Sequence, residues 1–262
     1  MNYETLLYEV ADGVATITFN RPEAANALSP RMACDLNQVS LEVDADPRVR
    51  AVVVTGKGRM FCAGGDLRAI SAAGDAARTV ILGMTGDLHL AISRLSRNPA
   101  PVIGAVNGTA AGAGFSVVMM CDLVVSAASA VYTMAYTNAG LAPDGSSTFF
   151  MPRRIGDRRA RELMLTNRVL SAEEALEWGV VNQVVDDDKV LSEALALATK
   201  LAAGPTLAYG RVKDLLNASF DNGLETQMEL ESRAIADMVD TADGREGISA
   251  FLSKRKPEFK GT

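Results

Sequence analysis

Two glycine-rich stretches of the chain could present backbone N–H groups to a bound ligand. Residues 107–116 read Asn-Gly-Thr-Ala-Ala-Gly-Ala-Gly-Phe-Ser, and residues 61–67 read Phe-Cys-Ala-Gly-Gly-Asp-Leu. Glycine lets other groups approach the backbone closely, and the first N–H groups of a helix have no partner within it. Two such groups from separate loops can stabilise one developing oxyanion, where losing a donor costs about 2.7–4 kcal/mol of transition-state stabilisation. Tight strand-to-helix connections would show the same spacing, so both interpretations stay open.

One carboxylate and one histidine are further candidates for chemistry. Asp144 lies in the sequence Pro-Asp-Gly-Ser at residues 143–146, ahead of an apolar segment. Pro-Asp-Gly is typical of a turn and aspartate is a good helix N-cap, so a structural role explains this residue. A positioned carboxylate can equally act as a general acid or base. His89 is the only histidine, and a lone histidine on a helix is more often structural. The sequence leaves both roles open for each residue.

Buried strands are predicted directly before both glycine-rich stretches. Residues 51–55 and 102–106 are short apolar runs bounded by turn-forming residues, which is typical of strands buried on both faces. Strands that alternate with helices indicate a parallel sheet covered by helices, and therefore an α/β protein. Further strands are predicted at residues 6–10, 14–19, 122–126 and 131–135. The first two of these flank an Asp-Gly turn and should form a hairpin.

The C-terminal part of the chain is predicted to be mainly helical. Earlier helices are expected after Ser29-Pro30, where serine is a good N-cap and proline suits the first turn, and at residues 76–97. Residues 68–79, rich in alanine and glycine, are expected to form a mobile loop. Ser171 and Glu174 form a capping box, and one short strand is expected at residues 180–185. Amphipathic helices are then predicted at residues 187–201, 205–216, 224–238 and 244–254.

The totals exclude several classes of protein. The chain has 262 residues, a formal net charge of −6 and 22% charged residues, which is ordinary for a globular protein and argues against a nucleic-acid surface. The first residues lack the pattern of a signal peptide, and no apolar run reaches membrane-spanning length. Three scattered cysteines make a disulfide framework unexpected, and a single histidine leaves few ligands for a metal. We therefore expect a cytoplasmic protein with no metal and no membrane or nucleic-acid partner.

Motifs along almost the whole chain resemble those of the crotonase (enoyl-CoA hydratase/isomerase) superfamily. No single motif is decisive, but their order is very specific. The motifs are Phe-Asn-Arg-Pro at residues 19–22, Asn-Ala-Leu at 26–28, the stretches 61–67 and 105–122, Gly-Leu-Ala-Pro-Asp at 140–144, residues 163–179, and Ser-Ala-Phe-Leu-Ser-Lys-Arg at 249–255.

The resemblance implies a fold, an assembly and a substrate. It implies a ββα spiral core over about residues 1–200 that binds a CoA thioester, and a helical region at 201–262 that forms the interface of a homotrimer or a dimer of trimers. The CoA thioester would be the substrate, and no cofactor is implied. Gly65 and Ala113 match the two positions whose N–H groups hold the thioester oxygen, with alanine in place of the commoner glycine at the second. CoA-contacting positions match Ala24, Ala25, Ala63, Asp66, Leu67, Phe251 and Lys254; an ordinary amphipathic helix end would also explain the last two.

The acid–base positions of the family point to isomerisation. Hydratases of this family use two glutamates, and these positions are Ser116 and Tyr136 here, so hydratase activity is not expected. Asp144 matches the single carboxylate of a subset that moves a proton between two carbons. Within the superfamily the chain is most similar to the 2-(1,2-epoxy-1,2-dihydrophenyl)acetyl-CoA isomerases, whose relatives also shift Δ3 double bonds to Δ2. We therefore expect an isomerase, with Ser116, Tyr136 and Leu88 in the acyl pocket.

Three alternatives remain open. Hydratase-type activity on an enoyl-CoA is one. His89 and Asp144 also fall where 4-chlorobenzoyl-CoA dehalogenases place a general base and a nucleophilic carboxylate, although the aromatic clamp of those enzymes is reduced here to Leu88 and Tyr136. A non-enzymatic RNA-binding or assembly protein is the third, against which the acidic balance and both glycine-rich loops argue. Neither the acyl group nor the choice between trimer and hexamer can be derived from the sequence.

Overall fold

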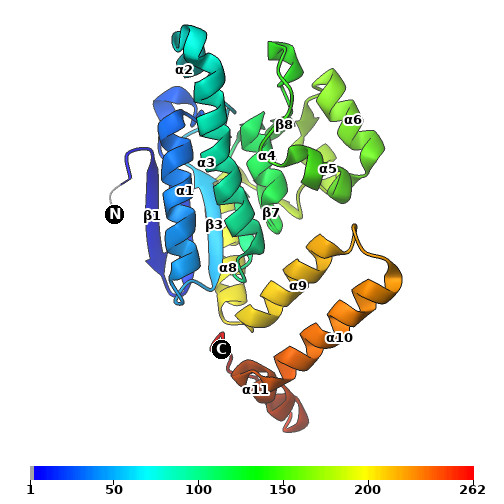
Figure 1. The fold of residues 1–262 in the computed structure, drawn as a ribbon. Coiled ribbons are helices and arrows are strands. Elements are labelled where there is room, and N and C mark those ends of the chain that lie inside the picture. Colours follow the sequence, from blue (N-terminus) through cyan, green and yellow to red (C-terminus); the bar gives the residue numbers. More distant parts are fainter. Residues whose placement is uncertain (1–2) are drawn as a thin grey trace.

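The computed structural model (Figure 1) describes residues 3–262, and its core is a six-stranded sheet in the order β1-β2-β3-β5-β7-β10. Only the β1–β2 hairpin is antiparallel. Every residue of β3 and β5 is buried, which confirms the interpretation of these apolar runs. The strands are β1 (Leu6–Ala11), β2 (Val14–Phe19), β3 (Ala51–Gly56), β5 (Val102–Val106), β7 (Leu123–Ala127) and β10 (Gln183–Val185).

A smaller sheet of four short strands stands beside the first. Its order is β4-β6-β8-β9, and its strands are β4 (Met60–Cys62), β6 (Thr109–Ala111), β8 (Val131–Thr133) and β9 (Leu170–Ser171). Each of β4, β6 and β8 directly follows a strand of the large sheet and precedes a helix. The chain thus repeats the order strand, strand, helix, which is the ββα unit expected for the core.

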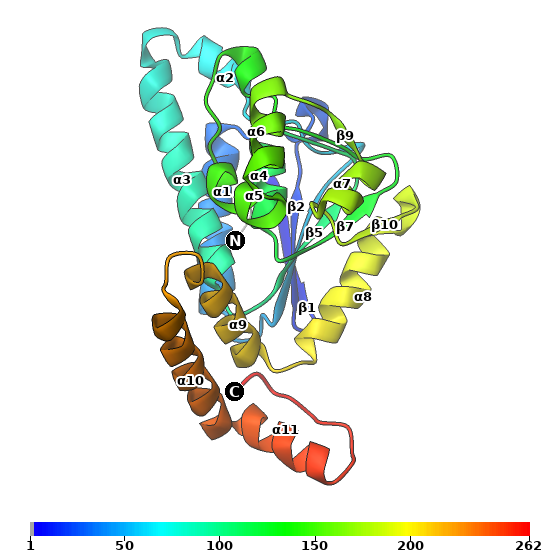
Figure 2. The same cartoon turned by 90° about the vertical axis from the view of Figure 1, so that its right-hand side faces the viewer.

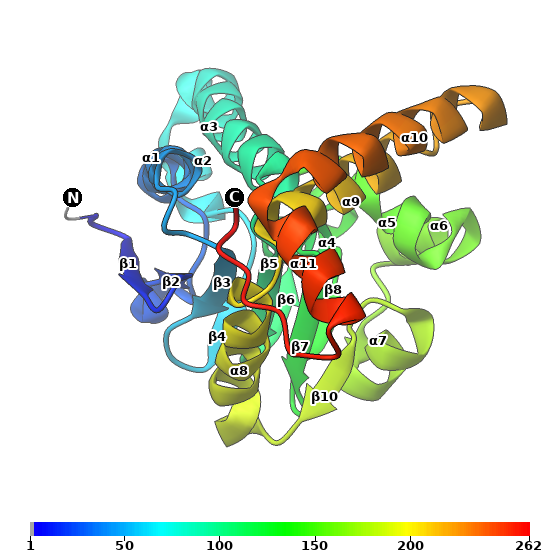
Figure 3. The ribbon, with the colours of Figure 1, turned by 90° about the horizontal axis from the view of Figure 1, so that it is seen from below.

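Helices cover both faces of the large sheet. Helices α1 (Pro30–Ala45) and α3 (Ala77–Arg97) lie side by side on one face, and α8 (Val190–Ala202) packs against β3, β5 and β7 on the other (Figure 3). Helix α1 begins where the sequence predicts, because the Ser29 hydroxyl accepts a hydrogen bond from the N–H of Met32 (3.2 Å). Helix α4 (Ala113–Met120) is buried along its whole length.

Residues 68–79 are not the loop expected from the sequence. They form most of α2 (Leu67–Ala72), the 3-10 turn η2 (Gly74–Ala76) and the start of α3. The reason is a cap that the sequence analysis overlooked: the Asp66 carboxylate accepts a hydrogen bond from the N–H of Ala69 (3.2 Å) and starts α2. The remaining helices of the body are η1 (Pro22–Ala24), η3 (Thr137–Ala139), α5 (Ser147–Ile155), α6 (Asp157–Thr166), α7 (Ala172–Trp178) and η4 (Asp187–Lys189).

Three helices after α8 project from the body as a C-terminal arm, which we define as residues 206–252 (Figure 2). They are α9 (Thr206–Ala218), α10 (Leu224–Asp240) and α11 (Ala242–Leu252). The tail after α11 folds back, and the Asp243 carboxylate accepts hydrogen bonds from the N–H groups of Lys260 and Gly261 (2.7 Å each). The division into a core of residues 1–200 and a helical region 201–262 stays a prediction. Large apolar side chains exposed on the arm include Leu216, Phe220, Leu224, Ile235, Phe251 and Leu252.

Candidate active site

The two glycine-rich loops meet in the structure. A Cβ added to Gly64 would lie 3.0 Å from the carbonyl oxygen of Ala111 and 3.4 Å from the Cα of Gly112, and Gly64 has a φ of +100°. Glycine is therefore required there both by its conformation and by the close approach. Gly65 and Ala113 are the next residues on the two loops, so their N–H groups come from neighbouring backbones. Within residues 3–262, neither N–H donates a hydrogen bond.

These loops form one wall of an apolar cleft of about 290 Å³. Gly65, Ala113 and Asp144 all line it. The other walls come mainly from α2, α3 and the segment before α5, and Thr85, Tyr136 and Asp144 are the lining residues with polar side chains. A Cβ added to Gly65 would meet nothing within 4 Å, because that position faces open space. The arrangement suits a hydrophobic ligand with one polar group held by free N–H donors.

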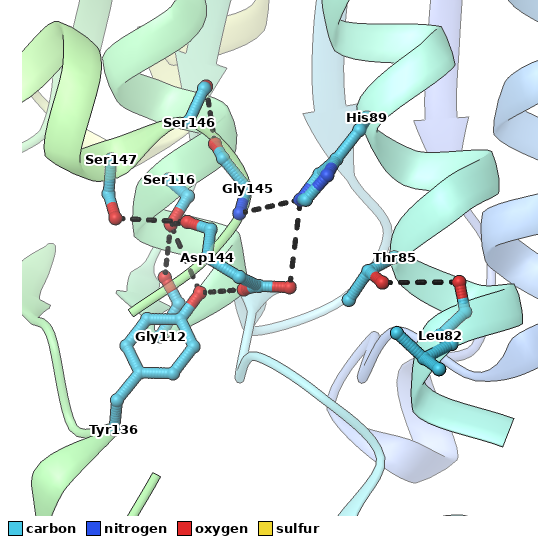
Figure 4. Close-up of polar contacts among 10 residues, drawn as sticks. All are labelled: Leu82, Thr85, His89, Gly112, Ser116, Tyr136, Asp144, Gly145, Ser146 and Ser147. Carbon is cyan, nitrogen blue, oxygen red and sulfur yellow. Dashed lines mark hydrogen bonds and ion pairs between the residues drawn. The ribbon is translucent and has the colours of Figure 1, made fainter. Parts of the chain in front are cut away.

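The Asp144 carboxylate faces into this site rather than capping a helix (Figure 4). Its Oδ1 accepts a hydrogen bond from the Tyr136 hydroxyl (2.5 Å), and its Oδ2 lies 4.0 Å from Nε2 of His89. Helix α5 has Ser146 at its N-cap position and no side-chain cap. The structural interpretation as an N-cap is therefore wrong, although Asp144 does sit in a turn, because its carbonyl oxygen accepts from the N–H of Ser147 (3.2 Å).

Tyr136 and Ser116, predicted together in the acyl pocket, are in contact with each other and with Asp144. The Ser116 hydroxyl lies 3.1 Å from the Tyr136 hydroxyl and 3.0 Å from the carbonyl oxygen of Asp144. Burial of the phenol raises the pKa of Tyr136, and the negative charge of Asp144 raises it further. The phenol therefore stays protonated and acts as a hydrogen-bond donor to the carboxylate.

His89 also reaches this group of residues from α3, and about half of its side chain is exposed. Its Nε2 accepts a hydrogen bond from the backbone N–H of Gly145 (3.2 Å; Figure 4). An accepting ring nitrogen carries no proton, so in this arrangement Nε2 neither donates to Asp144 nor has its lone pair free for a water.

Most candidate CoA-binding positions lie on or beside the wall of the cleft. Ala63 and Leu67 line it, and Leu88 of the predicted acyl pocket lines it as well. The N–H of Ala63 donates to the carbonyl oxygen of Ala25 (3.0 Å), which places η1 with Ala24 beside the glycine loop.

Asp66 is the charged residue among the candidates beside the cleft, and its carboxylate is already engaged. It pairs with Arg21 (3.1 Å) and also caps α2. Arg21 in turn donates to the carbonyl oxygen of Ala27 (2.6 Å). Arg21 was not expected among the site residues; its place in the Phe-Asn-Arg-Pro motif was the available signal.

Phe251 and Lys254 are not brought to the cleft of their own chain. Figure 1 shows α11 at the opposite end of the molecule from α2, which carries Leu67 of the cleft wall. The Phe251 side chain is 83% exposed.

Several cleft residues were missed by the sequence analysis. These residues are Ile81, Met84 and Thr85, next to Leu88. They are three or four positions apart, which places them on the same face of α3. In residues 3–262 no group of three His, Cys, Asp or Glu side chains could hold a metal ion. None of the helices described is both long and apolar enough to cross a membrane.

The chain is similar to known proteins along nearly its whole length. Residues 9–262 match the family described as Enoyl-CoA hydratase/isomerase. The chain is 42% identical to the 1,2-epoxyphenylacetyl-CoA isomerase of Escherichia coli K12, over 98% of this chain and 99% of that protein. It is 37% identical to 4-chlorobenzoyl coenzyme A dehalogenase-2 of an Arthrobacter species, over 94% and 90% of the two chains.

A solved structure confirms the predicted fold class. The crystal structure of an enoyl-CoA hydratase from Polaromonas sp. JS666 superposes with a TM-score of 0.92 at 35% identity, over 97% of this chain and 99% of that one. The α/β core with its ββα units and its helical C-terminal region is therefore the crotonase fold.

Proposed function

The chain belongs to the enoyl-CoA hydratase/isomerase family of acyl-CoA enzymes, and from this premise we propose that it is an enoyl-CoA isomerase with Asp144 as its acid and base. The observation that carries the proposal is the pairing of one carboxylate with two unpartnered N–H groups in one apolar cleft. A proton can then be moved from one carbon to another while the charge that develops on the thioester oxygen is stabilised.

The proposed reaction balances with one proton and no added reagent. The thioester oxygen accepts hydrogen bonds from the N–H groups of Gly65 and Ala113. Oδ2 of Asp144 removes a proton from C2 of a 3-enoyl thioester, and the electron pair spreads over a dienolate whose oxygen carries negative charge. The same proton then returns to C4, which leaves the double bond between C2 and C3. The scheme uses the CoA thioester as its substrate and no further cofactor.

The alternatives have less support. A hydratase of the two-glutamate type needs two carboxylates, and Ser116 and Tyr136 stand at those two positions. A dehalogenase would need His89 as a base for water, but its Nε2 already accepts from the N–H of Gly145. The dehalogenase relative and the Asp144–His89 approach of 4.0 Å keep this reaction as a second candidate. Shift of a straight-chain Δ3 double bond and ring-epoxide isomerisation both fit the same single carboxylate.

We also propose that the protein assembles as a homotrimer or a dimer of trimers and works in the cytoplasm. The support is the exposed apolar surface of the C-terminal arm, where Phe220, Leu224 and Ile235 are each more than half exposed. Monomeric proteins rarely expose so many large apolar side chains together. Assembly would also let Phe251 and Lys254 reach the CoA of a neighbouring copy.

The test is the ultraviolet absorbance of 3-hexenoyl-CoA, which changes when the double bond becomes conjugated with the thioester. The wild type should convert it, and Asp144→Asn should be slower by about 10²–10⁴-fold, the usual contribution of a general acid–base group. Asp75→Asn, which removes an exposed carboxylate on η2, is the matched control and should keep wild-type activity.

An Asp144→Asn variant with full activity would refute the role of Asp144. A wild type that leaves 3-hexenoyl-CoA unchanged but releases chloride from 4-chlorobenzoyl-CoA, or hydrates crotonyl-CoA, would replace the proposal with the corresponding alternative.

A further inference from the structure

Tyr136 makes the hydrogen bond that decides how the Asp144 carboxylate is held. Resting on the function proposed above, we infer that Tyr136 is a positioning residue: it fixes Oδ1 of Asp144, so that Oδ2 is the atom that moves the proton. The direct observation is the 2.5 Å hydrogen bond from the phenol to Oδ1 (Figure 4).

The phenol is also in contact with a side chain of α4. The Ser116 hydroxyl lies 3.1 Å from it, and Ser116 belongs to α4, the helix that begins with Ala113 of the proposed oxyanion hole. A Cβ added to Gly112 would lie 4.0 Å from Cε2 of the Tyr136 ring, so the glycine-rich loop comes close to the ring as well. The phenol hydrogen goes to Asp144. The single hydrogen of the Ser116 hydroxyl has three oxygens within reach: that of Tyr136 and the carbonyl oxygens of Asp144 (3.0 Å) and Gly112 (3.3 Å). Tyr136 thus links the base to the loop that holds the thioester oxygen.

The backbone on both sides of this contact is adapted to it. Ala135, directly before Tyr136, has a φ of +52°, a left-handed conformation that is unfavourable for a residue with a Cβ. Gly145, directly after Asp144, has a φ of +60°, and a Cβ there would come within 2.9 Å of the Cβ of Ser116. Strain on one side and a required glycine on the other are expected where the position of a side chain matters for function.

Few other groups act on this carboxylate. The titratable or charged side chains that face Asp144 are Tyr136, from the segment before η3, and His89, from α3. Within residues 3–262, no lysine or arginine forms an ion pair with Asp144. A donor that binds the charged form of a carboxylate favours that form. The phenol therefore opposes the cost of keeping a charge in an apolar cleft, and its own raised pKa ensures that it remains a donor.

The test compares the pH dependence of isomerisation in the wild type, Tyr136→Phe and Tyr132→Phe. Tyr136→Phe keeps the ring and removes one oxygen. We expect a kcat lower by about 10–100-fold and an acidic limb of the pH–rate profile displaced upward by about one unit, with KM changed by less than about twofold. Tyr132 is the matched control, because it is a fully buried tyrosine that donates to Ser126 (2.6 Å) outside the cleft. Its variant should lose stability and keep the wild-type profile.

A Tyr136→Phe profile that superimposes on that of the wild type would overturn the inference, as would a KM increase with unchanged kcat. If Tyr136→Phe does not fold, Ser116→Ala takes its place. That variant removes the hydroxyl that contacts the phenol, so we expect the acidic limb of the pH–rate profile to move in the same direction by a smaller amount. An unchanged profile overturns the inference.

A second readout separates this inference from the proposed function. In protein labelled with ¹³C at the aspartate carboxyl carbons, the Asp144 signal is identified by its absence in Asp144→Asn. Its titration midpoint should be higher in Tyr136→Phe than in the wild type, whichever acyl-CoA is the substrate. Failure of the wild type to isomerise 3-hexenoyl-CoA would refute the function alone, whereas an unchanged midpoint would refute the inference alone.

Discussion

Substitution of Gly114 by alanine tests whether close packing of the two glycine-rich loops creates the site. Gly114 is the second residue of α4, and a Cβ there would lie 2.4 Å from the carbonyl oxygen of Cys62, 2.7 Å from its Cβ and 2.9 Å from its Sγ. Cys62 is fully buried on β4, two residues before Gly64. No rotamer change can relieve a contact with a backbone oxygen, so the loop and the helix must move apart.

The magnitude of the effect follows from this geometry. Overpacking of a dense interior costs about 1–3 kcal/mol of the free energy of unfolding, and a clash with backbone places Gly114→Ala at the upper end. Gly65 and Ala113 lie on opposite sides of the contact, so moving it apart separates their N–H groups. If one donor is lost to the thioester oxygen, kcat should fall by about 10²–10³-fold.

The assay is urea unfolding together with the isomerisation rate. Gly86→Ala is the matched control, because Gly86 is exposed in the interior of α3 and a Cβ there meets nothing within 4 Å. That variant should be more stable by about 0.8–1 kcal/mol, from helix propensity alone, and equally active. A Gly114→Ala protein with wild-type stability would refute the packing argument. A destabilised variant with wild-type kcat would refute the assignment of the two N–H groups.

Two further predictions concern the interior. Burial raises the pKa of Cys62 and of Cys121 to about 12. At pH 8 a thiol reagent should therefore modify only the partly exposed Cys34 in the native protein, and all three cysteines after unfolding. Rapid modification of a second thiol in the native protein would contradict this prediction. Lys213 is buried and forms an ion pair with Asp122 (2.8 Å). Lys213→Met should lower the free energy of unfolding by about 3 kcal/mol, because the Asp122 carboxylate loses its cation. A variant as stable in urea as the wild type would show that the ion pair contributes little to stability.

Features set by short-range physics were predicted correctly from the sequence. The hairpin follows from alternation around an Asp-Gly turn, and its strands pair as expected from Leu6 with Phe19 to Ala11 with Val14. The capping box is present with both of its hydrogen bonds, from the N–H of Glu174 to Ser171 (3.2 Å) and from the N–H of Ser171 to Glu174 (3.0 Å). In each case the residues that determine the structure are within a few positions of one another. The resemblance supplied what local pattern could not, namely that the two glycine-rich loops meet.

The case of Asp144 shows why the rest of the site could not be predicted. Pro-Asp-Gly-Ser is equally suited to a helix cap and to a carboxylate presented in a cleft, and the difference is only where the side chain points. That direction is set by a hydrogen bond from Tyr136, eight residues earlier. The left-handed conformation of Ala135 and the close approach of Gly145 to Ser116 accompany this hydrogen bond. No hydrophobic periodicity in the sequence predicts these features. The packing of three separate segments therefore orients the Asp144 carboxylate. A chain in which Tyr136 is replaced should keep every other motif of this sequence and still hold the carboxylate in a different orientation.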